Sequence, residues 1–395
     1  MSRPSRSVAA ALLPAMAAVL TGFLVIGIAL PVLPLHVNRD LGFSTFVVGL
    51  VAGAQFIASV ATRIWAGSYA DRLGGKQAVM LGLIAAAASG MIYVLASVTE
   101  GWPILSVATL LAGRALLGGA ESFIITGGVS WGLATVEPHH AGKVIAWVGT
   151  AMFAALALGG PLGTMLFASQ GFAAIGLATA LLPLLVLLSL LRSPAPGPLA
   201  QRTKAPIRSV LSAVWLPGIG AALSSVGYGA ILAFGVLLYS DRDWQPVWLA
   251  FTAFGIALIA ARVICGHLPD KLGGARVALL FVVVQAAGLL LIGLACNGIV
   301  ASAGAALAGF GYALVYPGFG VEAIRGSSPE NRGLIMGIYT VFLDIAMAAG
   351  SPALGWVAGL KGLNAVFIAS AGVSLCATAI SFQLLRSRRH LGTVR

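Results

Sequence analysis

The chain has 395 residues, of which 59% are hydrophobic and only 9% are charged, and its mean hydropathy is +1.00. Soluble globular domains carry about 25% charged residues, so this composition excludes a water-solvated surface and indicates a chain largely surrounded by lipid. The formal net charge is +12, but the Lys and Arg residues are dispersed between apolar runs, which favours membrane topology over nucleic-acid binding.

Apolar segments of membrane-spanning length follow one another along the whole chain. A helix needs about 20 apolar residues to cross the hydrocarbon core, and runs such as LATALLPLLVLLSLL (177–191) lack the alternation of barrel strands. We therefore predict an all-α integral membrane protein with twelve transmembrane helices. The expected spans are 8–37, 45–67, 78–98, 103–132, 143–168, 171–191, 211–239, 246–268, 276–296, 299–324, 333–358 and 363–385.

The distribution of Lys and Arg predicts the orientation. Seventeen fall in one set of alternate loops and termini, and three fall in the other set, namely Arg39, Arg242 and Lys361. Under the positive-inside rule, both termini are expected to be cytoplasmic. The Pro-rich basic stretch 192–210 is nearly central, so we predict a six-helix bundle over 1–191, a cytoplasmic linker, and a second six-helix bundle over 211–395 that ends in a short basic tail.

A charged turn occurs twice. RIWAGSYADRLGGKQ (63–77) and RVICGHLPDKLGGAR (262–276) both hold an Arg, an Asp eight residues on, a basic residue directly after it, and Leu-Gly-Gly. Two further alignments, at offsets of 191 and 196, pair 137–163 with 328–355 and 111–123 with 307–319. Repeats in the same order predict two related halves, which is a recurring transporter architecture.

Three charges lie deep in predicted spans, namely Arg114, Glu121 and Asp344. Each costs about 2.5–3.5 kcal/mol at mid-bilayer, so they are expected to face one another or a polar cavity. In the aligned register Arg114 pairs with Phe310, Glu121 with Pro317, and Asp344 with Phe153. The deep charges are therefore not shared by the halves, and we interpret them as serving substrate or coupling chemistry.

Several motifs carry a family resemblance over essentially the whole chain. GSYADRLGGK (67–76) resembles the signature loop of the major facilitator superfamily, and 266–276 resembles its weaker second copy. RALLGG, from Arg114, resembles the fourth-helix motif of proton-coupled members. LGGPLG (158–163) resembles the fifth-helix motif of exporters, although Leu156 stands where glycine is usual.

Two more stretches resemble particular branches of that superfamily. ALPVLPLHV (29–37) resembles the first-helix pattern of drug and sugar exporters, and 339–355 is similar to the eleventh helix of bacterial arabinose-efflux-like permeases. The resemblance implies that the charged turns form a cytoplasmic gate, in which a carboxylate meets a helix N-terminus. The expected gate residues are Asp71, Arg72, Arg63, Asp270, Arg262, Gly67 and Gly74.

These observations predict a secondary active transporter that exchanges protons for a small organic solute, sugar-like or amphipathic, in the exporting direction. Desolvation and a nearby Arg together set the pKa of a buried carboxyl, which makes Glu121 the main candidate proton site. Arg114 would tune it or bind an anionic group, and Asp344 would be a second protonation or cation site. Tyr228, Tyr312 and Tyr316 are weaker candidates for lining a cavity, because single tyrosines also pack structurally.

The alternatives are an uptake symporter or facilitator, a membrane sensor, and an intramembrane enzyme. The short loops disfavour a sensor, and no metal cluster or nucleophile with its base falls in the spans, so no enzyme is expected. We expect no metal and no cofactor. The expected partners are protons, a small-molecule substrate and the bilayer, with no nucleic acid, and the expected state is a monomer in the bacterial inner membrane.

Overall fold

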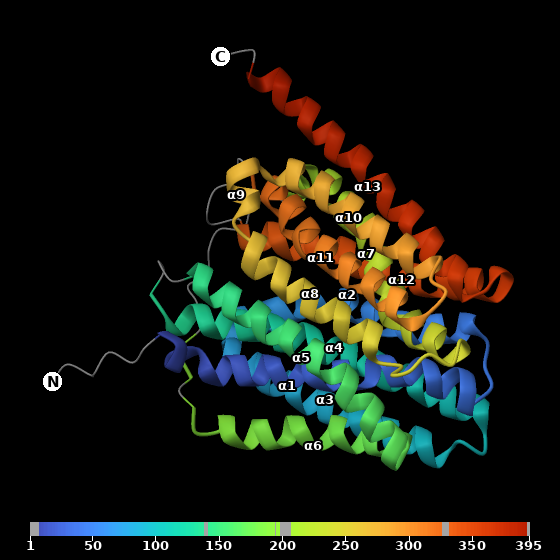
Figure 1. Cartoon of the computed structure of the whole chain (residues 1–395). Coiled ribbons are helices and arrows are strands. Elements are labelled where there is room, and N and C mark those ends of the chain that lie inside the picture. The colour runs from blue at the N-terminus through green and yellow to red at the C-terminus, as the bar shows by residue number, and fades with distance from the viewer. Residues whose placement is uncertain (1–7, 138–140, 194, 198–206, 326–331, 393–395) are drawn as a thin grey trace. The chain divides into compact units, whose positions relative to one another are not determined.

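The structure is a computed structural model that describes residues 8–137, 141–193, 195–197, 207–325 and 332–392. The regular elements in these ranges are all helical (Figure 1). They are α1 (Val8–Leu35), the π-helical η1 (His36–Asp40), α2 (Thr45–Leu73), α3 (Gly75–Val98), α4 (Pro103–Thr135), α5 (Ala141–Gln170), α6 (Phe172–Leu190), α7 (Ile207–Asp241), α8 (Leu249–Cys265), α9 (Leu268–Leu272), α10 (Gly274–Gly293), α11 (Gly298–Ala323), α12 (Arg332–Lys361) and α13 (Leu363–Gly392).

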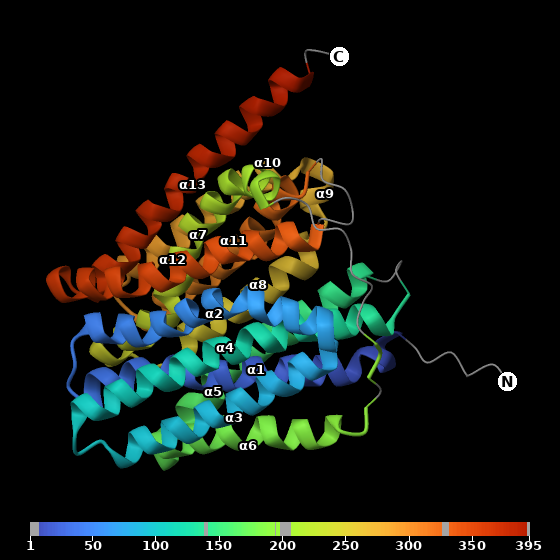
Figure 2. The same ribbon diagram turned by 180° about the vertical axis from the view of Figure 1, so that it is seen from behind.

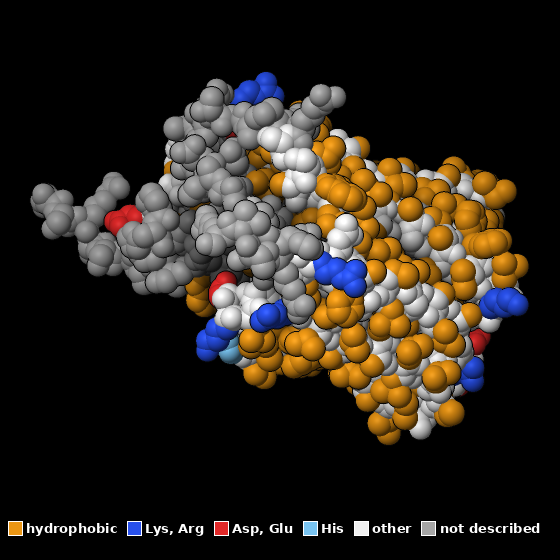
Figure 3. All heavy atoms as spheres, turned by 90° about the horizontal axis from the view of Figure 1, so that it is seen from above, with side chains coloured by type: hydrophobic (Ala, Val, Ile, Leu, Met, Phe, Trp, Pro, Cys, Tyr) orange, Lys and Arg blue, Asp and Glu red, His pale blue; other side chains and the backbone are white. Residues whose placement is uncertain are grey.

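Most of these helices have the length and composition of membrane spans. In the described part of the chain, 11 are long and apolar enough to cross a bilayer, and α8 is a shorter apolar helix. Large apolar side chains such as Ile64 and Ile104 are about four-fifths exposed, at 81% and 80%. Hydrophobic side chains also cover much of the described surface in Figure 3. The predicted all-α membrane fold is confirmed.

The contacts divide the chain into two units. The first holds 1–32 and 54–201, and the second holds 33–53 and 202–395. Within each unit the long helices run side by side for much of their length (Figures 1 and 2). Residues 33–53 fall in the second unit because the first turns of α2 pack on α12: the Thr45 hydroxyl donates a 2.7 Å hydrogen bond to the carbonyl of Gly355.

The close approaches of helices show how the two units correspond. A Cβ added at Gly118 would lie 1.9 Å from the carbonyl oxygen of Gln55, and one added at Gly309 would lie 2.3 Å from that of Phe254. Likewise, Gly127 meets the carbonyl of Gly75, and Gly318 meets that of Gly274, at 2.8 and 3.0 Å from the added Cβ. The residues of α2 and α3 in these pairs stand 199 positions before their counterparts on α8 and α10. The glycines of α4 stand 191 positions before their counterparts on α11.

The predicted offset of 196 for the fourth helix is therefore wrong by five residues. That alignment matched Leu-Ala-Gly letters, whereas the structure matches the glycines at which two backbones touch. In the corrected register Glu121 corresponds to Tyr312 instead of Pro317, and Arg114 corresponds to Ala305 instead of Phe310. The deep charges remain unshared, but their counterparts are different side chains.

The two charged turns share a glycine conformation. Gly74 has φ +98° and Gly273 has φ +86°, a region that residues with a Cβ rarely adopt. The glycines that follow them serve close packing instead, because a Cβ at Gly75 would lie 2.3 Å from the Trp131 nitrogen and one at Gly274 would lie 2.2 Å from the Gly318 carbonyl oxygen. Each Gly-Gly pair thus permits a turn and then a helix contact.

The helices that lead into those turns differ. The predicted span 45–67 implied that Asp71 lies in a loop. Helix α2 instead continues to Leu73, so Asp71 lies in its last turn. In the second unit α8 ends at Cys265, and the separate short α9 carries Pro269 in its first turn. Proline lacks the N–H that a continuous helix would require, which accounts for the break.

Candidate functional site

Glu121 lies on α4 in a cluster of polar side chains in the first unit. Its Oε2 accepts a 2.6 Å hydrogen bond from Nε2 of Gln55 on α2. Arg63 on α2 and Arg114 on α4 both lie within electrostatic range of the carboxyl. The side chain is only partly buried, whereas Gln55 is 1% exposed. The structure thus brings together three of the predicted residues, Glu121, Arg63 and Arg114, and adds Gln55.

Arg63 is held by a short chain of serine hydroxyls. Its Nη2 donates to Oγ of Ser59 at 2.9 Å, and that oxygen is 3.1 Å from Oγ of Ser122. Ser122 donates its one hydroxyl hydrogen to the Ser59 carbonyl at 2.9 Å, so Ser59 donates to Ser122. Arg63 was predicted as a gate residue near Asp71; its hydrogen bond to Ser59 lies one turn toward the N-terminal end of α2, and its gate role stays a prediction.

Arg114 is the largest fully buried side chain among the described residues, at 0% exposure. Its guanidinium nitrogens and the hydroxyl of Tyr93 have no hydrogen-bond partner among the described residues. Tyr93 on α3 lies within electrostatic range of Arg114. A buried cation is costly, and the carboxyl of Glu121, seven residues or about two turns along α4, lies within electrostatic range to offset part of that cost. Tyr93 was missed because a lone tyrosine in an apolar run carries no distinguishing signal.

The three predicted tyrosines gather in the second unit. Tyr228 on α7 stacks on Tyr312 of α11, with ring centroids 4.9 Å apart and planes 10° apart, and its ring centroid is 5.6 Å from that of Phe254 on α8. Tyr316 lies one turn further along α11. Arg262 of α8 is within electrostatic range of all three tyrosines. Arg262, in the last turn of α8, therefore lies beside an aromatic and polar cluster.

Hydroxyl hydrogens in this cluster can be assigned from the hydrogen bonds. Ser225 donates to the carbonyl of Ala221 at 2.7 Å, so at the 3.2 Å contact of Ser225 with Tyr312 the tyrosine is the donor. Thr340 donates to the carbonyl of Met336, so at its 2.9 Å contact Tyr316 is also the donor. Both phenol oxygens keep lone pairs, which are acceptors for a guanidinium.

Asp344 lies on α12 in the same unit. It is 3% exposed and lies within electrostatic range of Tyr312. The structure therefore places this predicted site residue beside the tyrosine cluster. Glu121 and Asp344 belong to different units, so each carboxyl is described with the side chains of its own unit.

The charged turns are exposed at their acidic residues and anchored in the first unit by a lysine. Asp71, Arg72 and Asp270 are exposed, and Arg72 Nε donates to the carbonyl of Ser68 at 3.2 Å. Lys76 is 7% exposed, and its Nζ donates to carbonyls at the end of α6, those of Leu191 and Ser193, at 3.4 and 2.7 Å. Lys76 thus caps a helix C-terminus. The gate role of Asp71, Arg72, Asp270, Gly67 and Gly74 stays a prediction.

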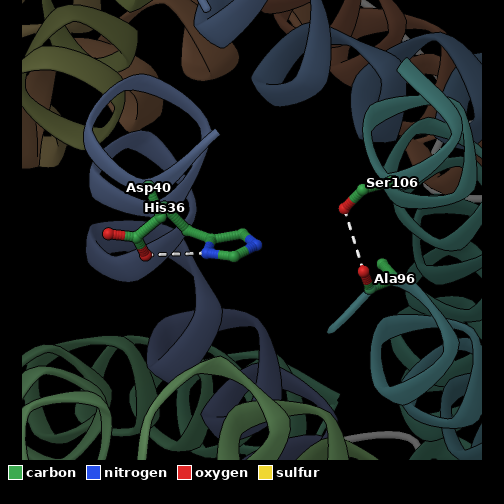
Figure 4. A network of polar contacts seen from close by, with 4 residues as sticks. All are labelled: His36, Asp40, Ala96 and Ser106. Carbon is green, nitrogen blue, oxygen red and sulfur yellow. Dashed lines mark hydrogen bonds and ion pairs between the residues drawn. The ribbon is translucent and has the colours of Figure 1, made fainter. Parts of the chain in front are cut away.

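Two further polar contacts, one in each unit, lie outside these clusters (Figure 4). In η1, His36 Nδ1 and Asp40 Oδ2 are 2.8 Å apart, and the His36 ring is buried. In the first unit the Ser106 hydroxyl donates to the carbonyl of Ala96 at 2.9 Å, which joins the start of α4 to the end of α3. Among the described residues no group of three or more His, Cys, Asp or Glu is placed to hold a metal ion.

Known proteins match nearly the whole chain. A model of the Major Facilitator Superfamily matches residues 15–323 and 247–393. An uncharacterized MFS-type transporter of Salmonella typhimurium is 39% identical over 370 residues, which cover 94% of this chain and 95% of the relative. The MFS-type transporter YhhS of Escherichia coli is 36% identical over 363 residues, which cover 92% and 89%.

A solved structure has a similar fold. It is a bacterial homologue of the human lysosomal transporter Spinster in an inward-facing, unoccupied conformation, with a TM-score of 0.76 and coverage of 98% of both chains. The two sequences are 15% identical, so the likeness concerns the fold alone.

Proposed function

Because the chain belongs to the major facilitator superfamily and is a multi-pass membrane transporter, we propose that it is a proton-coupled antiporter. In this proposal it exports a small organic solute, sugar-like or amphipathic, by alternating access. The observation that carries it is the environment of Glu121: a carboxyl at membrane depth, bonded to Gln55 and within electrostatic range of Arg63 and Arg114. Members of this superfamily are transporters and not enzymes.

Gln55 suits a carboxyl that gains and loses a proton. Its amide Nε2 donates to Glu121, and its Oε1 has no hydrogen-bond partner among the described residues. An amide can turn over and present its oxygen as an acceptor. The ionised Glu121 accepts from the nitrogen, and the protonated Glu121 donates to the oxygen. One side chain therefore supports both states of the proton site.

Protonation of Glu121 would change the forces between α2 and α4. The ionised carboxyl attracts Arg63 across the helix pair, and neutralisation removes that attraction. Arg63 and Asp71 are eight residues apart on the continuous helix α2, which is about 12 Å along its axis. A rigid helix could transmit the change to the exposed turn that is the proposed cytoplasmic gate, formed with Arg72, Gly67 and Gly74.

The other deep charges have separate parts in the proposal. Arg114, fully buried beside Tyr93, tunes the proton affinity of Glu121. Asp344, in the second unit, is a second protonation or cation site. Asp270 is the counterpart of Asp71 in the second gate. We propose that the protein is a monomer in the bacterial inner membrane with both termini cytoplasmic, since each chain carries both units.

An uptake symporter or facilitator is the alternative, and Leu156 favours it because the fifth-helix exporter motif has glycine at that position. Energised inverted membrane vesicles distinguish the two. A pH-sensitive dye would be followed while sugars, amphipathic cations and organic acids are added one at a time. Antiport predicts proton release by one compound class; a proton symporter would not release protons from the acidified interior in exchange for an externally added solute.

The variants assign the coupling residue. Glu121→Gln should abolish the response while the protein remains folded, because the amide cannot carry the proton. Asp243→Asn is the matched control: Asp243 is exposed in the loop after α7 and has φ +54°, a conformation that Asn also tolerates. An undiminished response in Glu121→Gln would refute the assignment of the proton site.

A further inference from the structure

The helix contact beside Arg114 also occurs in the second unit. A Cβ added at Gly113 of α4 would lie 2.8 Å from Cε1 of Tyr93 on α3. A Cβ added at Gly304 of α11 would lie 3.0 Å from Cγ1 of Ile292 on α10. The two glycines are 191 positions apart and the side chains that they meet are 199 apart, as in the other matched contacts. The two units therefore pack these helices in the same register.

Three buried positions at this contact differ in polarity between the units. In the second unit they carry small or apolar residues, so the helices pack there without a charge or a hydroxyl at these positions. In the first unit all three are polar, and all three are 0% exposed. The fold therefore does not require polar groups at this place, and their presence in the first unit indicates a site. The pairs are Ser89 and Gly288, Tyr93 and Ile292, and Arg114 and Ala305.

The contact in the first unit holds more hydrogen-bond donors than acceptors. The three guanidinium nitrogens of Arg114 and the hydroxyl of Tyr93 are buried without a hydrogen-bond partner among the described residues. Ser89 donates its hydroxyl hydrogen to the carbonyl of Gly113 at 2.8 Å. A guanidinium has five N–H donors, and one phenol oxygen accepts two at most. Even if Tyr93 accepted from Arg114, at least three N–H groups would still need an acceptor.

A negatively charged acceptor fits this site better than water does. A water molecule would accept from the guanidinium but would leave the buried cation without a counter-charge, which is costly. Glu121 is seven residues further along α4, about two turns and about 10 Å of helix rise, so its carboxyl offsets only part of that cost. Because Arg114 and Tyr93 are fully enclosed, the anion must be small, which excludes the bulk of an organic solute.

We infer that Arg114 and Tyr93 bind a small inorganic anion, such as chloride, between α3 and α4. The guanidinium supplies the charge and several N–H donors, and the phenol O–H donates from the neighbouring helix. This anion site goes beyond the proposed transport function and does not depend on it, since it requires only the geometry of the first unit. The anion and an ionised Glu121 are attracted by the same guanidinium and repel one another, so the ionised carboxyl weakens anion binding.

The test measures the melting temperature of the purified protein in detergent at fixed pH and ionic strength. Sodium gluconate, whose anion is too large for the site, is replaced stepwise by sodium chloride or sodium bromide. Both halides should raise the melting temperature along a saturating curve, as a ligand of the folded state does. In crystals grown with bromide, an anomalous scattering peak should lie within hydrogen-bonding distance of the Arg114 guanidinium. A melting temperature that does not change with halide, or a bromide map without that peak, would overturn the inference.

The variants test the two named groups. Arg114→Met removes the charge and the donors and should abolish the halide response, measured against the same variant in gluconate. Tyr93→Phe keeps the ring on Gly113 and should weaken halide binding by about tenfold, because it removes one hydrogen bond to a charged group. If Arg114→Met does not fold, Tyr93→Phe decides alone. Wild-type halide affinity in Tyr93→Phe, or a wild-type response in a folded Arg114→Met, would overturn the assignment.

The matched control is an arginine outside the site. Arg242 is exposed in the loop after α7, where its Nη2 donates to Oδ1 of Asn364 at 2.9 Å. Arg242→Gln should therefore keep the full halide response. Loss of the response in this variant would show that the halide acts through surface charge, which would overturn the inference.

Glu121→Gln separates this inference from the proposed function. The amide does not repel an anion, so this variant should bind chloride more tightly than wild type in the same titration, and weaker binding would overturn the inference. Whether Glu121 carries the proton is decided by proton release in vesicles, which needs a gradient and a solute, whereas the halide titration needs neither. Either proposal can thus fail while the other stands.

Discussion

Two adjacent glycines on α4 give opposite predictions for the same substitution. A Cβ at Gly118 would lie 1.9 Å from the backbone oxygen of Gln55, while one at Gly119 would lie 3.6 Å from Cγ2 of Thr62. Ordinary contact begins near 3.4 Å, so Gly118→Ala must separate α2 from α4 by about 1.5 Å. Gly119→Ala fits into the space that exists.

The size of the effect follows from two terms. Overpacking costs about 1–3 kcal/mol, and displacing Gln55 breaks its 2.6 Å bond to Glu121, which as a bond to a charged group contributes about 1.5–3 kcal/mol. Replacing a helical glycine by alanine returns about 0.5–1 kcal/mol. The net expectation is a loss of about 2–5 kcal/mol for Gly118→Ala and a gain of about 0.5–1 kcal/mol for Gly119→Ala.

The assay is thermal unfolding of both variants and wild type, purified in one detergent and scanned at one rate. Gly118→Ala should melt below wild type, and Gly119→Ala should melt at or above it. Proton release in vesicles should also fall in Gly118→Ala, because the partner of the proton site is displaced. Equal melting temperatures for the two variants would refute the helix contact from which the repeat register and the site geometry are derived.

Three further substitutions test features outside the Glu121 cluster. Lys76→Met should lower the free energy of unfolding by about 1 kcal/mol, because it removes the donor at the α6 carbonyls. Lys271→Met, in an exposed turn, should change that stability little, and melting curves of the two variants measured side by side test the difference. Gly74→Ala should cost about 1–2 kcal/mol through its left-handed backbone, whereas Gly67→Ala, where an added Cβ meets nothing within 4 Å, should not destabilise the protein in the same assay. Asn297→Ala should cost about 1 kcal/mol by removing the 2.9 Å cap at the start of α11, and unchanged hydrogen exchange in the first turn of α11 would contradict it.

Much of the fold could be predicted because long apolar runs and the lysine and arginine distribution are properties of the chain itself. The short helix α9 was not predicted, and the predicted span 246–268 extends three residues beyond Cys265, where α8 ends. The register of the fourth helix was wrong because letter matches at 111–123 outweighed the glycines, and only the structure shows which of these glycines touch another backbone.

Of the candidate site, only the charged residues could be predicted from the sequence. Glu121, Arg114 and Asp344 stand out because charges are rare at membrane depth. Lys76 was read as a topological charge, and nothing in a single sequence indicates that its Nζ caps α6. The association of Arg262 with tyrosines on two other helices joins residues 34 positions before it and 50 to 54 positions after it, which periodicity within one helix does not reveal.

The central claim is that Glu121 carries the exchanged proton. The most direct measurement is proton release by the purified protein in weakly buffered detergent solution, on addition of the compound that responds in vesicles. Wild type and Asp243→Asn should release protons when the compound binds, and Glu121→Gln should bind the compound without releasing any. Proton release by Glu121→Gln equal to that of wild type would contradict the account.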